Sequence, residues 1–315
     1  MPASSDMTKP YTGGKFNLEF DDKKSAGFVS AIDGGHFKSA GPVQSLVGNE
    51  NYITKYTGKP VYDDITITVG AAMSPTFWKW VSASLENKPE RRNGALVGYD
   101  FNFCERTRRS FYGALISEVA FPALDAAAKS TAALNIKISP ERIEFKSGDG
   151  SKLSGGQAQD QMAKQKLWLT NNFRFELERF KGDPALRNAK IEAFTVKQNV
   201  VSNPIGYEMD TRKEVGRLEL PQIVVTFPEA QIEGWMKWYD VAVAKGNRRD
   251  QYTTGMIAYF ASDANKTELM RIELAGVSLV SVEIDKYEAH KEAISMAKAT
   301  LNIEQLTLKP GKGTV

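Results

Sequence analysis

Few residues in this 315-residue chain have the types and spacing that catalysis or metal binding needs. Nucleophilic catalysis requires a serine or cysteine beside a base, yet the only histidines are His36 and His290, in different halves of the chain. His36 follows Asp-Gly-Gly, which is typical of a turn. A lone Cys104 favours a reducing compartment, and with two histidines it does not complete a zinc site. We therefore expect no enzymatic activity, no cofactor and no metal site.

Paired carboxylates and glycine-rich loops are the remaining candidates for chemistry. Asp63 and Asp64 are neighbours at a predicted strand, so their side chains should point to opposite faces. Glu141 and Glu144 are interpreted, like them, as solvated charges that protect a strand edge. The glycine-rich segment 147–156 lacks the Gly-Lys-Ser/Thr signature of a phosphate-binding loop. None of these groups predicts a catalytic or nucleotide site.

Composition and charge exclude several other classes of protein. The chain is 42% hydrophobic and 25% charged, as ordinary globular proteins are. Its formal net charge is only +3, and both halves are nearly balanced, which disfavours a specific nucleic-acid-binding module. The polar amino terminus has no secretory-signal pattern, and no apolar run is long enough for a membrane helix. We expect synthesis in the cytoplasm and no membrane insertion by this chain.

An internal repeat organises the sequence. Each half has a strand-like run, a Lys-Trp segment, a double arginine, a second strand-like run and a closing Leu-Asn-Ile tripeptide, in the same order. In the first half these features begin at Asp64, Ser74, Arg91, Gly98 and Leu134; in the second they begin at Pro221, Ile232, Arg248, Gly255 and Leu301. The repeat predicts a tandem duplication.

The periodicity predicts a mainly β protein with a few helices. Apolar and polar residues alternate over 16–20, 65–69, 111–119, 134–138 and 272–284, as in sheets with one solvated face. One helix is predicted in each half at the Trp-bearing segment, with Ser74 as N-cap and Pro75 in the first turn of the earlier one. A further helix is predicted at 286–297.

The expected unit is a small antiparallel β-barrel or sandwich with one flanking helix, and the chain is expected to hold two of them. Residues 1–146 form the first predicted domain, 147–165 a Gly/Ser-rich linker, and 166–315 a second, diverged domain.

Tryptophan and arginine are the residues singled out for structural roles. We expect the indoles to anchor each helix on its barrel: Trp78, Trp80, Trp235 and Trp238. The double arginines are interpreted either as solvated loop residues or as inter-subunit contacts that pair with a neighbour's carboxylates: Arg91, Arg92, Arg248 and Arg249.

A resemblance to a known family starts near the amino terminus. The runs Tyr11-Thr-Gly-Gly-Lys-Phe-Asn-Leu-Glu-Phe20 and Ala26-Gly-Phe-Val-Ser-Ala-Ile-Asp-Gly-Gly35 resemble the start of tail tube proteins of contractile bacteriophages and extracellular contractile injection systems. Gly58-Lys-Pro-Val-Tyr62, Phe77-Trp-Lys-Trp80 and Phe121-Pro-Ala-Leu-Asp-Ala126 fit the same pattern. The resemblance covers 11–146 and is looser over 170–308.

The resemblance implies a structural subunit of an inner tail tube, in which six barrels form a ring around a channel and rings stack. Implied partners are the chain itself, as hexamers or as trimers with pseudo-sixfold symmetry, and sheath, baseplate or spike and terminator proteins. DNA or protein cargo would pass through the lumen without specific binding. The implied location is a virion tail or injection particle assembled in the bacterial host cytoplasm.

Two other functions stay open at this point. A tandem chain could form a trimeric pseudo-hexameric hub, adaptor or tube-initiator ring at the baseplate. From a different class, a surface- or carbohydrate-binding module would use the tryptophans as exposed stacking platforms. For the tube, we hypothesise that strand addition joins neighbouring barrels and that the segment 35–62 reaches an adjacent ring.

Overall fold

The computed structural model describes residues 14–20, 24–41, 43–46, 53–153, 168–181, 190–204, 211–246, 251–263, 266–285 and 294–311. Residues 14–153 are called the first half below, and residues 168–311 the second half.

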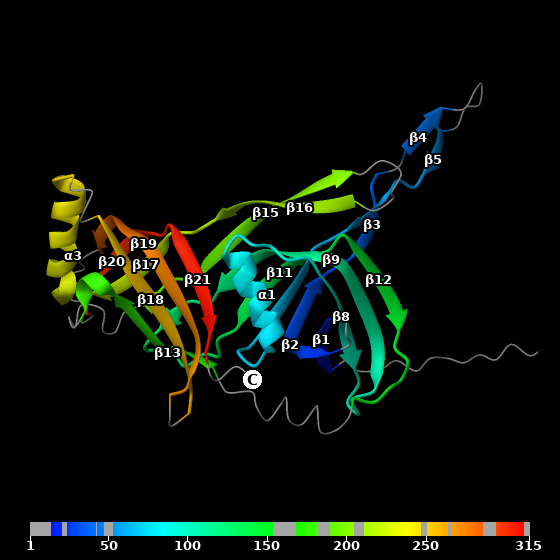
Figure 1. Cartoon of the computed structure of the whole chain (residues 1–315), viewed down its shortest axis with the longest axis horizontal. Coiled ribbons are helices and arrows are strands. Elements are labelled where there is room, and N and C mark those ends of the chain that lie inside the picture. The colour runs from blue at the N-terminus through cyan, green and yellow to red at the C-terminus, as the bar shows by residue number, and fades with distance from the viewer. Residues whose placement is uncertain are drawn as a thin grey trace, which may run out of the picture.

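Figure 1 shows a molecule built almost entirely of antiparallel strands, in two barrel-like sheets. The first half contains β1 (Lys15–Phe20), β2 (Ser25–Gly34), β3 (Phe37–Ser39), β4 (Val43–Leu46), β5 (Ile53–Tyr56), β6 (Pro60–Tyr62), β7 (Ile65–Val69), α1 (Pro75–Leu85), β8 (Arg92–Tyr99), β9 (Glu105–Phe121), β10 (Leu124–Asp125), β11 (Leu134–Ser139) and β12 (Arg142–Ser147). The second half contains β13 (Trp168–Leu177), η1 (Glu178–Phe180), β14 (Lys190–Ile191), β15 (Phe194–Pro204), β16 (Thr211–Glu219), β17 (Ile223–Pro228), η3 (Glu229–Gln231), α3 (Ile232–Tyr239), the π-helical turn η4 (Asp240–Ala244), β18 (Tyr252–Ala261), β19 (Glu268–Ile284), β20 (Met296–Asn302) and β21 (Gln305–Pro310). The predicted fold class, mainly β with few helices, is confirmed.

The first sheet closes on itself. Its path runs β7, β2, β1, β8, β9 and β11, and β11 pairs again with β7. Inward-facing residues such as Ile65, Ile67 and Ile136 are completely buried, as alternation along the strands requires. The result is a small barrel with β12 added to the outer end of β9.

The second sheet repeats these pairings. The path β17, β20, β19, β18, β13 follows the order β7, β11, β9, β8, β1 of the first sheet, and β21 pairs with β19 as β12 pairs with β9. Gly113 on β9 and Gly276 on β19 both have positive φ, 59° and 64°, and a β-carbon at either would overlap the side chain of Glu141 or Glu304. Gly113 and Gly276 are as far apart in the sequence as Glu141 and Glu304. The glycine–glutamate contact therefore recurs at the same spacing in both halves.

Strand register corrects the sequence repeat in one place. Ile138 pairs with Ile116 in the first sheet, and Leu301 pairs with Leu279 at the corresponding place in the second. Leu301 therefore corresponds to Ile138 and not to Leu134, so the two Leu-Asn-Ile tripeptides are not equivalent. The duplication itself stays a prediction.

Helix α1 begins as the sequence predicts. The Ser74 hydroxyl accepts a hydrogen bond from the backbone N–H of Phe77 at 3.3 Å, and Pro75 occupies the first turn, where its missing N–H costs nothing. The helix buries Phe77, Trp80 and Val81 against the sheet. Hydrophobic burial thus fixes α1 on the barrel.

The further helix predicted at 286–297 is wrong at its carboxyl end. Met296 and Ala297 lie in β20 and pair with Pro228 and Phe227 of β17. A strand forms there because β17 and β19 pair with β20 on both sides. The local sequence does not show which strands become its neighbours. Residues 286–293 lie outside the described part of the chain.

The halves exchange structure across the predicted domain boundary. From the second half, β15 pairs with β9, and from the first half, β10 pairs with β14. The first residues of the predicted linker are also bound to the first half, because the N–H of Leu153 donates to the carbonyl of Phe103 at 2.9 Å. Residues 154–165 lie outside the described residues, and the division into domains stays a prediction.

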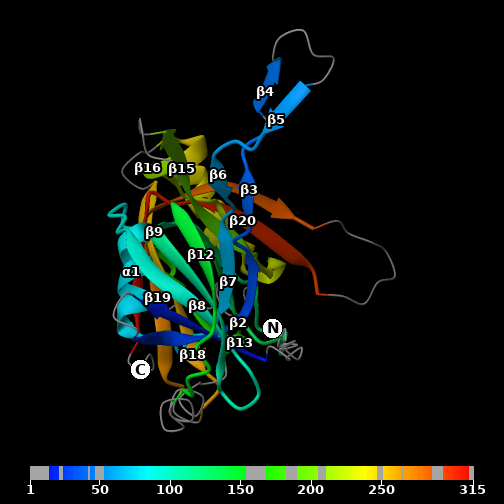
Figure 2. The ribbon, with the colours of Figure 1, turned by 90° about the vertical axis from the view of Figure 1, so that its right-hand side faces the viewer.

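Two β-hairpin arms leave the barrels at corresponding places. The first arm consists of β3 and β6 at its base and β4 and β5 toward its tip, and it projects from the molecule (Figure 2). The second arm consists of β15 and β16 and lies along the first half (Figure 1). Among the described residues, the second arm pairs with a strand of the other half, and the first arm does not.

Candidate functional site

The candidates for chemistry are dispersed and bound in local structure. His36 is exposed after β2, Asp63 pairs with Lys38 at 2.8 Å, and the Ser139 hydroxyl donates to Asp64 at 2.5 Å. Among the described residues, no three His, Cys, Asp or Glu side chains gather in a way that could hold a metal ion. The described residues form no catalytic constellation.

The tryptophans singled out from the sequence are interior residues. Trp78, Trp80, Trp235 and Trp238 are at most 1% exposed. The Trp80 indole N–H donates to the carbonyl of Glu90 at 2.8 Å, which ties the helix to the start of β8.

The continuous surface that the structure does build is the place where the second arm docks on the first half, called the arm site below. Its centre is an antiparallel ladder in which Phe194 pairs with Phe121, Val196 with Val119, and Lys197 with Glu118. The same register continues into the pairing of Leu124 with Ile191. Main-chain hydrogen bonds therefore join the two barrel sheets along one strand.

Apolar side chains fill the arm site. The rings of Phe121 and Phe194 stack with centroids 4.8 Å apart, and both residues are almost completely buried. Val119 and Val196 are each 2% exposed. Burial of these side chains and the aromatic contact stabilise the docked arm.

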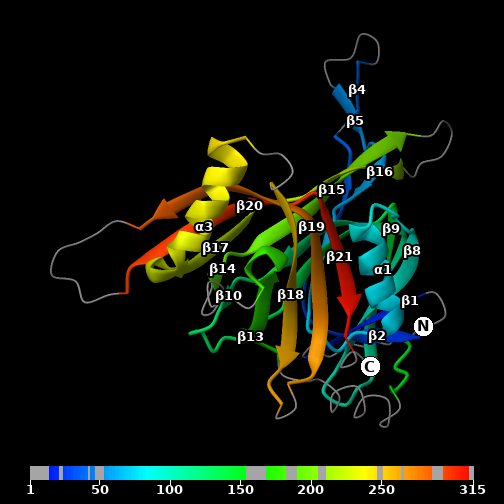
Figure 3. The ribbon, with the colours of Figure 1, turned by 60° about the vertical axis from the view of Figure 1, so that its left-hand side comes forward.

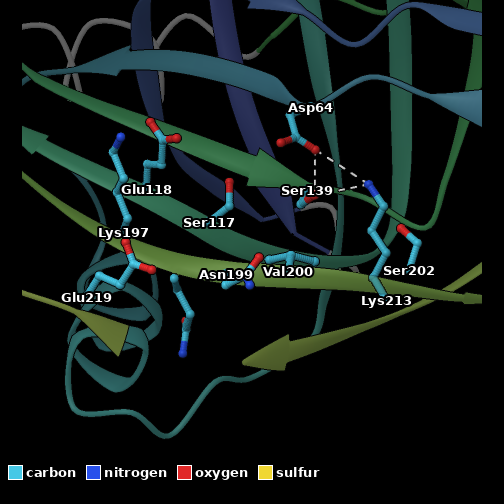
Figure 4. Close-up of a pocket in the computed structure, with 11 residues that line it drawn as sticks. Asp64, Ser117, Glu118, Ser139, Lys197, Asn199, Val200, Ser202, Lys213 and Glu219 are labelled. Atoms are coloured by element: carbon cyan, nitrogen blue, oxygen red, sulfur yellow. Dashed lines mark hydrogen bonds and ion pairs between the residues drawn. The ribbon is translucent and has the colours of Figure 1, made fainter. Parts of the chain in front are cut away.

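Polar groups from both halves complete the arm site (Figure 4). The Lys213 ammonium on β16 donates to Ser139 Oγ at 3.0 Å and lies 3.5 Å from Asp64 Oδ1. On the inner side, the Ser84 hydroxyl of α1 donates to Gln198 Oε1 of β15 at 3.0 Å. These bonds fix the position of the arm as well as its strand register.

The arginines have different surroundings. Arg91 Nη2 donates to the carbonyl of Lys213 at 2.5 Å, and Glu141 accepts from Arg91 Nε and from the backbone N–H of Lys213. Arg92 pairs locally with Glu90 at 2.7 Å. Thus Arg91 lies in the arm site, within one chain, and Arg92 does not touch the arm.

The later double arginine lies outside the described residues. In the second sheet Thr253 pairs with Val277, as Arg92 pairs with Ala114 in the first sheet. By strand register, the counterpart of Arg92 is therefore Thr253. An inter-subunit role for Arg248 and Arg249 stays a prediction.

We expect the substitution Arg91→Ala to lower the free energy of unfolding by about 1 kcal/mol, because the residue is partly exposed and its bonds have a modest net value. Hydrogen exchange of β16 amides should accelerate at the same time. Arg92→Ala is the matched control and should leave exchange in β16 unchanged; equal acceleration in both variants would contradict this assignment.

Helix α1 forms a further contact between the halves. Its Ser82 hydroxyl donates to the carbonyl of Leu308 on β21 at 2.9 Å. Trp78 lies one turn before Ser82 and Leu85 one turn after it on the same face of the helix, and both are buried. Figure 3 shows α1 lying beside β21. The end of β9 and the outer face of α1 are therefore two of the surfaces by which the first half contacts the second.

A buried charge cluster lies on the opposite face of the first sheet. Arg108 binds Glu19 at 3.0 Å and Glu105 at 2.8 Å, and both carboxylates are nearly inaccessible. The Tyr99 hydroxyl donates to Glu19 at 3.2 Å. Burial first, and the nearby carboxylates second, raise the pKa of Tyr99, so it stays a neutral donor.

Sequence reasoning did not find the arm site, although one signal was available. Glu141 lies between β11 and β12, and Glu304 lies between β20 and β21, at the same spacing as Gly113 and Gly276. This equal spacing can be read from the sequence, but no pattern of residue types identified Phe194 or Lys213. A contact made by residues so distant along the chain leaves no local periodicity.

No helix among the described residues is both long and apolar enough to span a bilayer.

One protein-family model matches part of the chain. Residues 13–144 match the model of the T4-like virus tail tube protein gp19 family. No curated protein matches the chain significantly.

Two solved structures are similar to part of the chain. A chain from an extracellular contractile injection system, the PVC sheath–tube complex in the extended state, is 15% identical, with 45% of this chain and 94% of that chain covered and a TM-score of 0.37. A chain from the anti-feeding prophage cap, a tube-terminating cap, is 16% identical, with 47% and 100% covered and a TM-score of 0.39.

Proposed function

We propose that this chain, whose residues 13–144 match the tail tube family, is a structural subunit of the inner tube of a phage tail or contractile injection system. The family match is the observation that carries the proposal. In this role the chain assembles with itself into rings around a channel and works without catalysis.

The fold and the arm site support a structural role. Two small barrels joined by strand pairing bury their strand edges against each other, which is how sheet proteins avoid unwanted association and build specific contacts. Sheath, baseplate and terminator proteins are the proposed partners, and the virion tail or injection particle is the proposed location. Cargo is proposed to pass through the lumen without specific binding.

The buried tryptophans weigh against the surface-binding module. Stacking platforms for sugars need accessible aromatic faces, whereas the four indoles named above are interior. A trimeric hub or adaptor ring remains the second candidate, because the chain contains two barrel-like sheets and three copies would supply six.

The proposal is tested by the mass and symmetry of the purified assembly, from native mass spectrometry with negative-stain images. Hollow filaments or stacked rings are expected for the tube. A closed ring that never stacks would favour the hub, and a persistent monomer would contradict both.

Deleting residues 44–57 from the first arm should abolish tube growth while leaving a folded protomer. The base of the arm, β3 and β6, keeps its pairing in this variant, and the barrel contacts are untouched. Circular dichroism checks the fold and electron microscopy checks the tubes. Normal tubes from the deletion would show that the tip of the arm does not link rings.

A further inference from the structure

We infer that a second copy of this chain docks on the second half in the way that the second half docks on the first, so that the interface inside the chain is repeated between chains. This inference deepens the proposed function and rests on it.

The internal interface defines which surfaces are needed. In two of its contacts the first half contributes the end of β9, residues 118–121, and the outer face of α1. The second half contributes β15 and β21. Because the strand pairings of the first half recur in the second, each of these four surfaces has a counterpart elsewhere in the chain.

The counterpart of the β9 end is an open strand edge. Register equates residues 118–121 with residues 281–284 of β19, since Ile116 and Leu279 occupy corresponding places. Residues 281–284 pair with β20 on one side, and β18 ends its pairing at Ser278. In the described part of the chain no strand covers the other side, and Ile284 is 48% exposed where its counterpart Phe121 is 1% exposed.

The counterpart of β15 is the base of the first arm. Ile32 of β2 pairs with Ile67 as Ile191 of β14 pairs with Val225, and residues 35–38 therefore correspond to residues 194–197. Strand β1 stops pairing with β2 at Val29, and among the described residues no other strand pairs with this edge of residues 35–38. The Arg109 guanidinium lies beside it and donates to the carbonyl of Gly34 at 2.8 Å. Phe37 is 65% exposed, whereas its counterpart Val196 is buried.

Transferring the internal register predicts the new ladder. Val282 of one copy should lie opposite Phe37 of the next, and Glu283 opposite His36. These are a β-branched–aromatic pair and an acid–imidazole pair, both favourable across antiparallel strands.

The helix surfaces give an independent second contact. The Lys-Trp segments align Trp78 with Met236 and Leu85 with Val243. Trp78 and Leu85 are buried in α1, a helix that contacts β21, whereas Met236 is 47% and Val243 is 43% exposed.

The strand that would cover α3 is β12 of the next copy. Phe145 pairs with Arg109 as Leu308 pairs with Ile272, so Phe145 is the counterpart of Leu308, which lies beside α1. Phe145 is exposed and packs on Phe37 with ring centroids 5.5 Å apart. The exposed aromatic residues Phe37 and Phe145 of the first half are called the donor patch. Met236, Val243 and Ile284 of the second half are called the acceptor patch.

Both patches belong to one heterologous interface, which closes into a ring or continues as a helix. Exposed apolar side chains at positions whose counterparts are buried in the internal interface are what an unoccupied interface leaves on a single protomer. If six barrels complete the ring, three chains of 34.9 kDa do so, giving a mass of about 105 kDa.

Engineered disulfides test the register. In a Cys104→Ser background, the pair Phe37→Cys and Val282→Cys should give oxidised species of two and three chains on non-reducing gels. The pair Val119→Cys and Val196→Cys is the positive control, because those residues are paired within one chain and should crosslink without an increase in mass. Lys38→Cys with Val282→Cys places the thiols on opposite faces and should not crosslink.

Complementation tests the interface without relying on one variant. Phe37→Asp with Phe145→Asp disables the donor patch, and Met236→Asp with Ile284→Asp disables the acceptor patch; all four side chains are exposed, so both proteins should fold. Each variant alone should be monomeric by native mass spectrometry. An equimolar mixture should form a one-to-one dimer, since each partner retains the patch that the other lacks.

The outcomes separate this inference from the proposed function. Rings or tubes formed equally well by both variants, or no interchain disulfide in assembled protein, would overturn the inference and leave the tube intact. Interchain disulfides and a wild-type trimer that never stacks would support the inference and contradict the tube. A wild type that stays monomeric would overturn both.

Discussion

Replacing Arg108 by methionine should lower the free energy of unfolding by about 3–5 kcal/mol, because removal of one partner leaves buried carboxylates uncompensated. Arg108 is the bidentate partner of Glu105 and also binds Glu19, and these two acids are 4% and 6% exposed. Chemical denaturation with matched slopes measures the loss.

Two controls separate lost charge pairing from lost packing. Arg106→Met removes a similar side chain whose pair with Asp100 is more exposed, and its effect should be much smaller. Adding Glu19→Gln and Glu105→Gln to Arg108→Met should recover much of the stability, since neutral amides tolerate burial better than charges. Failure of this rescue would mean that shape, not charge, makes Arg108 necessary.

The second large effect is expected at the arm site. Phe194→Ala should cost about 3–5 kcal/mol, the range for removing a large buried aromatic side chain. The cavity would form between the halves, against Phe121, so we also expect faster hydrogen exchange in β15 and β16 than in β18 and β19.

Phe101→Ala is the matched control for Phe194→Ala, because Phe101 is 84% exposed and should contribute little. If Phe194→Ala instead loosened all strands equally, the arm would not be a separate contact between the halves. In that case the transfer of its geometry to a second copy would lose its physical basis.

The arm site and its proposed counterpart between chains relate the stability of the protomer to the assembly of the ring. Within the chain, strand addition and helix packing cost no translational entropy, because the halves are covalently joined. Between chains the same contacts must overcome that cost, which several exposed apolar side chains can do once they are buried together. A tandem chain therefore reduces the number of separate association steps needed to complete a ring.

Several features followed directly from the sequence. Alternating residues at 65–69 and 134–138 predicted strands because a half-buried sheet imposes a period of two. Ser74 and Pro75 predicted the start of α1. A serine hydroxyl can accept from a free N–H group of the first turn, and a proline has no N–H group that needs an acceptor. The motifs of the first half led to the tail tube family, which residues 13–144 match.

Tertiary structure alone decided how the halves combine. Strand register showed that the two Leu-Asn-Ile tripeptides are not equivalent, and strand pairing placed Met296 in β20. Docking of the second arm placed Lys213 beside Arg91. Local patterns record which face of an element is buried, because that follows from period and polarity. They do not record which distant strand supplies the missing hydrogen bonds, so the arm site and its open counterpart on β19 became apparent only in three dimensions.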